Sequence, residues 1–125
     1  MSSRILIIDD EPALMTALCD YLEQHGFICE CVAEVAEAQA LLANVQFDVV
    51  LTDIYISPLQ EADGLRVLSF IRERALDVRL VVMTAHSTPE LQAEAFRLGA
   101  AVVLQKPTSL SVLAAALTAA AEVPA

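Results

Sequence analysis

The sequence lacks the features of membrane proteins and of nucleic-acid-binding proteins. No uninterrupted apolar run approaches the roughly 20 residues of a membrane-spanning helix, although the mean hydropathy is +0.59. The 7 basic residues form no cluster, and 17 acidic residues bring the formal net charge to −10, which repels nucleic-acid phosphates. The first apolar run ends in the carboxylates of Asp9 and Asp10, so it is a poor secretory signal. We therefore expect a cytoplasmic protein that contacts no membrane and no nucleic acid directly.

Cysteine is scarce and has no metal-binding spacing. Cys19, Cys29 and Cys31 make an odd number, and none belongs to a CxxC pair. Cys29 and Cys31 are two residues apart in an expected strand, so both would point from one face into the core. Because free cysteine packs as a small hydrophobic residue, we expect three buried, reduced thiols.

Short β-branched runs alternate five times with longer amphipathic segments. No linker, repeat or low-complexity tract interrupts them, which predicts one domain over residues 1–125. Nearly continuous apolar runs are typical of strands buried on both faces of a parallel sheet. The expected strands are Arg4–Ile8, Ile28–Val32, Phe47–Thr52, Arg79–Met83 and Ala101–Leu104.

Helix signals fill the segments between these strands. Pro12 and Pro89 favour a first helical turn, Thr88 is an N-cap, and Gly26 and Gly99 end helices. The first helix should bury Leu14, Ala17, Leu18, Tyr21 and Leu22. The other expected helices are Val35–Ala43, Leu65–Arg74, the segment from Pro89 to Gly99, and a last one capped by Ser109 that fades near Pro124. The alternation predicts an α/β fold, a parallel sheet with helices on both faces.

Polar side chains stand at the carboxyl ends of four expected strands, where open parallel sheets bind ligands. Asp9 and Asp10 end the first strand, Asp53 the third, Thr84 the fourth and Lys106 the fifth. Clustered carboxylates repel one another, and Mg²⁺ relieves that repulsion while keeping several waters of its own. A carboxylate beside such an ion is suited to attack phosphorus, with a hydroxyl and an ammonium stabilising the transferred group.

These motifs, in order, resemble the receiver domains of two-component response regulators over essentially the whole chain. The matching elements are Ile7-Ile8-Asp9-Asp10-Glu11-Pro12, Asp48-Val49-Val50-Leu51-Thr52-Asp53, Asp63-Gly64-Leu65, Val82-Met83-Thr84-Ala85, Gly99-Ala100 and Lys106-Pro107. The resemblance implies a (βα)5 fold, doubly wound, with five parallel strands in the flavodoxin-like order 2-1-3-4-5.

The resemblance also implies a role for each polar residue. Asp53 is the expected phosphoacceptor, and Asp10 is a direct Mg²⁺ ligand. Asp9 acts mainly through a metal-bound water, and the Tyr55 carbonyl completes the protein's share of the metal shell. Lys106 pairs with Asp53 and later with a phosphoryl oxygen.

The same resemblance makes Thr84 the hydroxyl that swings toward the phosphoryl group, and a cis Lys106–Pro107 peptide is usual in the family. The phosphodonor would be a phosphohistidine on a sensor histidine kinase or a phosphotransfer protein. The chain would then be a switch with self-directed phosphotransfer and dephosphorylation, and not an enzyme with an external substrate.

The chain departs from the family pattern at three places. The stretch 54–62 before Asp63 is a few residues longer than usual, and either shields the acceptor, contacts a partner or is an inert bulge. Val103 stands where Tyr or Phe commonly acts as a rotamer switch, which puts the usual coupling to Thr84 in doubt. Tyr55 and His86 lie where family members tune water access to the phosphoryl group; the plain alternative for His86 is an exposed loop histidine.

The fourth helix, fifth strand and fifth helix form the face that the family uses for output and dimerisation. The last helix is alanine-rich with little charge, so we expect at most weak homodimers of this chain, and an output domain or partner would bind this face. The residues favour two other functions less. An aspartate-nucleophile Mg²⁺ phosphohydrolase would separate its first two aspartates by one residue, whereas Asp9 and Asp10 are adjacent. A non-phosphorylated binding module would not need the full set of site residues.

Overall fold

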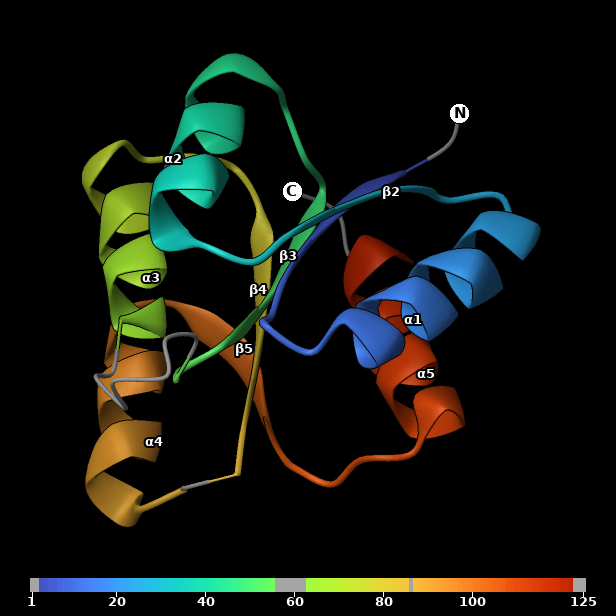
Figure 1. Ribbon diagram of the computed structural model, residues 1–125. Coiled ribbons are helices and arrows are strands. Elements are labelled where there is room, and N and C mark those ends of the chain that lie inside the picture. Colours follow the sequence, from blue (N-terminus) through green and yellow to red (C-terminus); the bar gives the residue numbers. More distant parts are fainter. Residues whose placement is uncertain (1–2, 56–62, 86, 123–125) are drawn as a thin grey trace.

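The computed structural model describes residues 3–55, 63–85 and 87–122, in which strands and helices alternate from end to end (Figure 1). The strands are β1 (Arg4–Ile8), β2 (Ile28–Val32), β3 (Val49–Asp53), β4 (Arg79–Thr84) and β5 (Ala100–Gln105). The helices are α1 (Pro12–Gln24), α2 (Val35–Asn44), α3 (Gly64–Glu73), α4 (Pro89–Arg97) and α5 (Leu110–Glu122). None of the helices in these ranges combines the length and apolarity that crossing a bilayer demands.

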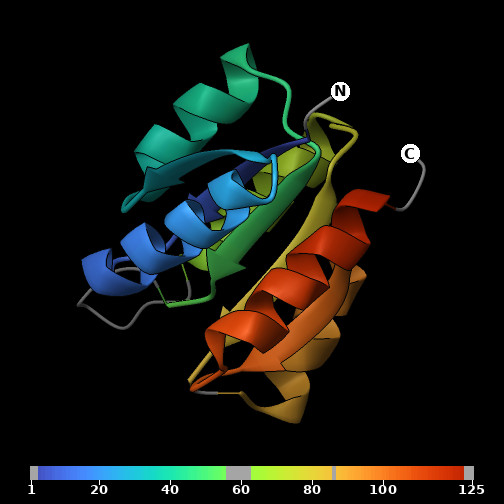
Figure 2. The ribbon, with the colours of Figure 1, turned by 90° about the vertical axis from the view of Figure 1, so that its right-hand side faces the viewer.

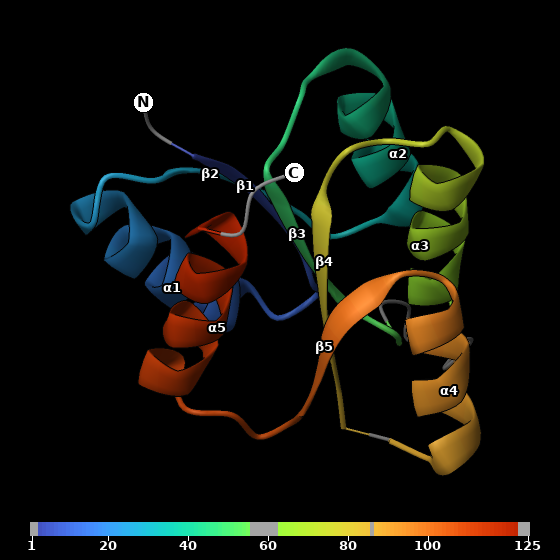
Figure 3. The same cartoon turned by 180° about the vertical axis from the view of Figure 1, so that it is seen from behind.

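The strands form one parallel sheet in the order β2-β1-β3-β4-β5, which confirms the predicted α/β fold and strand order. Helices α1 and α5 cover one face of the sheet, and α2, α3 and α4 cover the other (Figures 1 and 3). Figure 2, turned by a quarter, looks onto α1 and α5, with the twisted sheet behind them.

Burial on both faces explains the continuous apolar runs. In β1, Ile5 and Ile7 belong to the core under α1 and α5, whereas Leu6 and Ile8 belong to the core under the other three helices. All four side chains are fully buried. Since successive side chains of a strand point to opposite faces, a strand with helices on both sides needs apolar residues at every position.

The helix ends follow the sequence signals. The Leu91 N–H donates to Thr88 Oγ1 at 3.1 Å and the Val112 N–H to Ser109 Oγ at 3.2 Å, which confirms both predicted N-caps. Gly99 follows α4 with φ = +105°, a conformation that L side chains rarely adopt.

The first helix is turned relative to the prediction. Leu18 and Leu22 are buried as expected, but Ala17 is exposed and Tyr21 is 36% exposed. Cys19 takes the place of these residues in the core. The buried face of α1 is therefore rotated, so that it meets α5, the sheet and the edge strand β2 together.

The prediction of three buried, reduced thiols is wrong. Cys31 is exposed, and a disulfide joins it to Cys19, while Cys29 is free and half-buried. The prediction treated β2 as a core strand, but β2 lies at the edge of the sheet, next to β1 alone. An edge strand leaves side chains at its end accessible to solvent.

Candidate functional site

The carboxyl ends of β1, β3, β4 and β5 lie at one edge of the sheet. The register pairs Ile8 with Thr52, Asp53 with Met83, and Thr84 with Gln105, so the strands end nearly level. Asp53 and Thr84 are the last residues of β3 and β4, and Asp9 and Lys106 directly follow β1 and β5. The structure thus places these four predicted site residues at the same edge.

The ammonium group of Lys106 lies among three carboxylates. Its Nζ is 2.8 Å from Asp53 Oδ2, 2.9 Å from Asp9 Oδ2 and 2.8 Å from Glu11 Oε1. The Asp9 and Asp53 side chains are 0% and 8% exposed, whereas Glu11 is 57% exposed. Buried charges need such partners, because an unpaired charge in the interior is strongly destabilising. Glu11 has no role in the sequence interpretation, although its place directly after two aspartates is a signal that could have found it.

Backbone N–H groups hold the other carboxylate oxygens. The Glu11 N–H donates to Asp9 Oδ1 at 2.9 Å, and the Tyr55 N–H donates to Asp53 Oδ1 at 3.0 Å. Each aspartate is therefore fixed at both oxygens, one by the ammonium and one by the chain that follows it. This arrangement orients Asp53 before any ligand arrives.

The electrostatics of the site favour neutralisation of the acids. Burial raises the pKa of Asp53, against the opposing effect of Lys106 and the Tyr55 N–H. Burial and the neighbouring Asp9 raise the pKa of Asp10. Burial alone would lower the pKa of Lys106, but its hydrogen bonds to the three carboxylates raise it, so it stays charged. The ammonium is thus a permanent positive charge in an acidic site.

Gly64 brings the start of α3 against the strand end that carries Asp53. The Gly64 N–H donates to the Ile54 carbonyl at 2.8 Å. A Cβ at this position would overlap the Asp53 carbonyl oxygen and lie 2.7 Å from Ile54 Cα. Only glycine fits this close approach of two backbones.

The remaining predicted residues lie around this centre. Asp10 is exposed, Thr84 is fully buried, and its carbonyl accepts the Lys106 N–H at 2.9 Å. Tyr55 is half-buried and packs against the core, as does Val103. The peptide bond between Lys106 and Pro107 is cis, as the resemblance implied. His86 and the inserted stretch 56–62 lie outside the described residues.

The sequence that builds this site is matched by a known family. The response regulator receiver domain family matches residues 5–118 of the sequence. The chain belongs to this receiver domain family.

Relatives of the receiver domain include much longer proteins. This chain is 36% identical over 106 residues to the alginate biosynthesis transcriptional regulatory protein AlgB of Pseudomonas putida. The match covers 85% of this chain and 23% of that protein. The receiver domain thus spans about a quarter of the length of this relative.

Solved structures of receivers have the same fold. The non-phosphorylated HemR receiver domain of Leptospira biflexa has a TM-score of 0.89 at 26% identity, covering 99% of this chain and 98% of that one. A response regulator protein of Burkholderia pseudomallei, solved with a phosphorylated aspartic acid, a calcium ion and citrate, has a TM-score of 0.80 at 25% identity, covering 97% and 70%.

Receiver domains generally bind Mg²⁺ at their acidic site, and the carboxylate side chains of this receiver are of the chemical type that binds such an ion. Among residues 3–55, 63–85 and 87–122, no three His, Cys, Asp or Glu side chains form a ready-made metal cage. Mg²⁺ does not require one, since one or two carboxylates and several waters suffice. Asp9 and Asp53 each direct one oxygen to a shared cation, the Lys106 ammonium. The donor set is made of hard oxygen ligands, which Mg²⁺ prefers.

Proposed function

We propose that this receiver domain is a phosphorylation switch of a cytoplasmic two-component system, in which Asp53 accepts a phosphoryl group from a phosphohistidine. The donor would be a sensor histidine kinase or a histidine phosphotransfer protein. The observation that carries the proposal is the Lys106 ammonium, which bridges the buried Asp9 and Asp53 carboxylates at 2.9 and 2.8 Å. The phosphorylated aspartic acid of the related Burkholderia pseudomallei protein supports it.

In the proposed step, a carboxylate oxygen of Asp53 attacks phosphorus, and the bond from phosphorus to the histidine nitrogen breaks. Hydrogen bonds from the Tyr55 N–H and from Lys106 hold the Asp53 carboxylate in a single orientation. This reduces the entropy lost on reaching the transition state. Lys106 then shifts to a phosphoryl oxygen and stabilises the charge on the transferred group. Asp9, Asp10, Asp53 and the Tyr55 carbonyl would hold Mg²⁺, which neutralises part of the negative charge of acceptor and donor.

The chemistry is self-directed, with no external substrate turned over. The acyl phosphate of Asp53 would be hydrolysed within the same site, which returns the switch to its resting state. A phosphohydrolase with an aspartate nucleophile is not favoured, since the oriented carboxylate lies at the end of the third strand, and the first strand is followed by two adjacent aspartates.

Output would leave the site through Thr84 and the face formed by α4, β5 and α5. Thr84 ends β4, and its carbonyl accepts the N–H of Lys106, which directly follows the neighbouring strand β5. Val103 packs half-buried on the core where a ring would be needed for the usual rotamer switch. An output domain, a partner or a second copy in a weak dimer would bind this face. NMR spectra with and without Mg²⁺–beryllofluoride test the route: unchanged shifts at Thr84 and Ala85 would exclude it.

The phosphoacceptor is tested by intact mass spectrometry after incubation with acetyl phosphate and Mg²⁺. We expect the mass of one phosphoryl group to be added, and the addition to be lost in Asp53→Asn. Asp77→Asn is the matched control, because Asp77 is exposed and lies before β4, at the opposite end of the sheet. Phosphorylation that persists in Asp53→Asn would refute Asp53 as the acceptor. Phosphorylation that never appears in the parent protein would refute the proposal and favour a non-phosphorylated binding module.

A further inference from the structure

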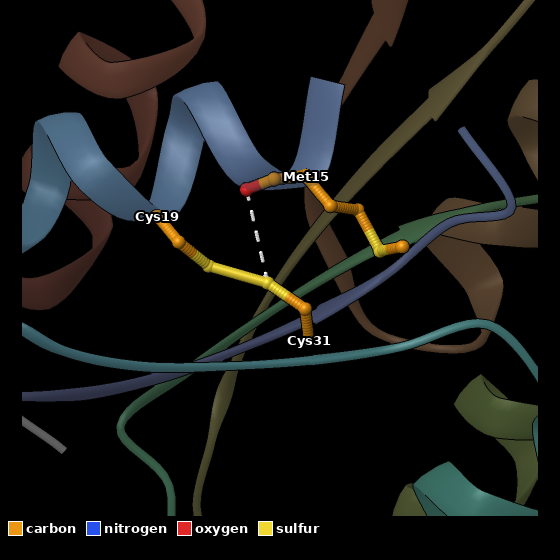
Figure 4. The surroundings of a disulfide bond; sticks show 3 residues. All are labelled: Met15, Cys19 and Cys31. Carbon is orange, nitrogen blue, oxygen red and sulfur yellow. Dashed lines mark hydrogen bonds between the residues drawn. A yellow bond between two sulfur atoms is a disulfide. The ribbon is translucent and has the colours of Figure 1, made fainter. Parts of the chain in front are cut away.

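Two cysteines connect α1 to the edge strand β2. Cys19 lies in α1, where it is 9% exposed, and Cys31 lies in β2, where it is exposed. A disulfide joins their sulfur atoms, and Figure 4 shows it crossing from the helix to the strand. The proposed phosphorylation chemistry uses neither residue.

The different exposure of the two cysteines suits reversible exchange. Thiol–disulfide exchange requires an attacking thiolate to reach one sulfur of the bond. Cys31 is accessible because β2 pairs on one side only, with β1. Cys19 belongs to the core on the inner side of α1, so a small reagent meets Cys31 first, and Cys19 completes the reaction from within the protein.

The third cysteine does not compete with this pair. Cys29 lies two residues before Cys31 on β2 and packs half-buried against the core below α1 and α5. Burial, and secondarily Glu23, raise the pKa of Cys29 to about 11, so at neutral pH it is almost entirely a thiol. Since only the thiolate attacks a disulfide, Cys29 is a poor partner for exchange.

The two elements that the bridge joins both contact the acidic turn of the site. On β2, the Val32 carbonyl accepts the Asp9 N–H at 3.1 Å, one residue after Cys31. On α1, the Met15 N–H donates to the Glu11 carbonyl at 3.1 Å. The turn from Asp9 to Glu11 is therefore held between the two elements that the disulfide joins.

The thiol and bridged forms differ at this junction. The Cys31 sulfur is 3.8 Å from the Met15 carbonyl oxygen (Figure 4), and only the thiol form has the hydrogen to donate to it. The two Cα atoms are 7.6 Å apart, more than the roughly 4.4–6.8 Å of most disulfides. Closing the bond within that range would draw α1 and β2 together, so we expect their approach to differ between the two forms.

We propose that Cys19 and Cys31 form a reversible redox modification site that restrains the start of α1 beside the acidic turn. The oxidant is a low-molecular-weight disulfide of the glutathione class. The Cys31 thiolate attacks one sulfur of this disulfide, forms a mixed disulfide and expels one small thiolate. The Cys19 thiolate then attacks the Cys31 sulfur and expels the second. The protons of the two protein thiols go to the two small thiolates, and the protein loses two electrons that the small disulfide gains.

The test counts alkylatable thiols after equilibration with oxidised or reduced glutathione, quenching and denaturation. We expect alkylation of all 3 cysteines in the reduced protein and of Cys29 alone in the oxidised protein. In Cys29→Ser, the count should fall from two to zero on oxidation, and Cys19→Ser should stop at the glutathione adduct of Cys31. Three free thiols under oxidising conditions, or a bridge that includes Cys29, would overturn the proposal.

Restraint of α1 is measured separately by backbone hydrogen exchange in Cys29→Ser, without Mg²⁺ or phosphodonor. We expect slower exchange of the Met15 amide in the oxidised form, and equal rates would overturn this part of the proposal. Neither measurement depends on Asp53, so a failure of the phosphorylation proposal would leave both results interpretable.

Discussion

Replacement of Gly64 by alanine should disturb the strand end that carries Asp53. The new Cβ would overlap the Asp53 carbonyl oxygen and lie 2.9 Å from the Asp53 carbonyl carbon. Both atoms belong to the backbone, so relief requires β3 and α3 to move apart. Overpacking of this kind costs about 3 kcal/mol, and weakening the bond from the Gly64 N–H to Ile54 adds up to about 1 kcal/mol. At an m value of about 2 kcal/mol/M in urea, the unfolding midpoint should fall by about 1.5–2 M.

Gly26→Ala provides the control for this experiment. Gly26 has φ = +89°, but nothing lies within 4 Å of a Cβ built there. Its replacement carries only the cost of a left-handed backbone, about 1 kcal/mol, or about 0.5 M in urea midpoint. Gly64→Ala should also slow labelling by acetyl phosphate, and Gly26→Ala should not. Equal midpoints for the two variants would refute the argument that backbone contact at Gly64 positions the site.

Three further predictions concern charge, capping and the disulfide. Burial raises the pKa of Asp53 above its unfolded value of 3.8. The stabilisation of the folded state by protonated Asp53 is therefore fully present below that pH and is lost as pH rises through the folded pKa. In EDTA, the urea midpoint of Asp53→Asn should therefore exceed that of the parent by a margin that grows from ~pH 4 to ~pH 7; a constant margin would contradict this. Thr88→Ala removes the acceptor of the Leu91 N–H and should lower the free energy of unfolding by about 1 kcal/mol in urea titrations, whereas Thr88→Ser should not. The bridge from Cys19 to Cys31, with a sequence separation of 12, should make the oxidised protein about 3 kcal/mol more stable than the reduced one, a difference that Cys31→Ser should abolish.

The fold was predictable because its signals are local and consistent. Alternating runs, the N-caps Thr88 and Ser109, and Gly99 give the elements and their ends, and right-handed crossovers leave few arrangements for a parallel sheet. The strand order came from the resemblance, since periodicity does not say which strand lies at an edge. The error at Cys31 arose because the thiol prediction relied on periodicity alone, although the implied strand order already placed the second strand at an edge, where Cys31 is exposed.

Which residues form the site could be predicted, but which contacts they make with one another could not. Strand ends identify Asp9, Asp53, Thr84 and Lys106, because parallel strands end at the same edge. The contact of Glu11 with Lys106 depends on how the chain turns into α1, where the Glu11 N–H bonds to Asp9. Likewise, the cost of a side chain at Gly64 appears only when two segments ten residues apart are placed together in space.

The enclosure of Lys106 gives this domain a built-in chemical reporter. Lys106 is the only lysine in the sequence, and its side chain is 13% exposed within its ring of acids. Reagents that acylate amines should therefore spare the folded side chain and react with it once the ring opens. The amino terminus is the other amine that reacts, so any lysine adduct comes from the Nζ of Lys106. The rate at which this adduct forms records how often Nζ leaves its three carboxylate partners. A mass-spectrometric time course that separates the Lys106 adduct from the amino-terminal one would follow the opening of the site with no residue replaced.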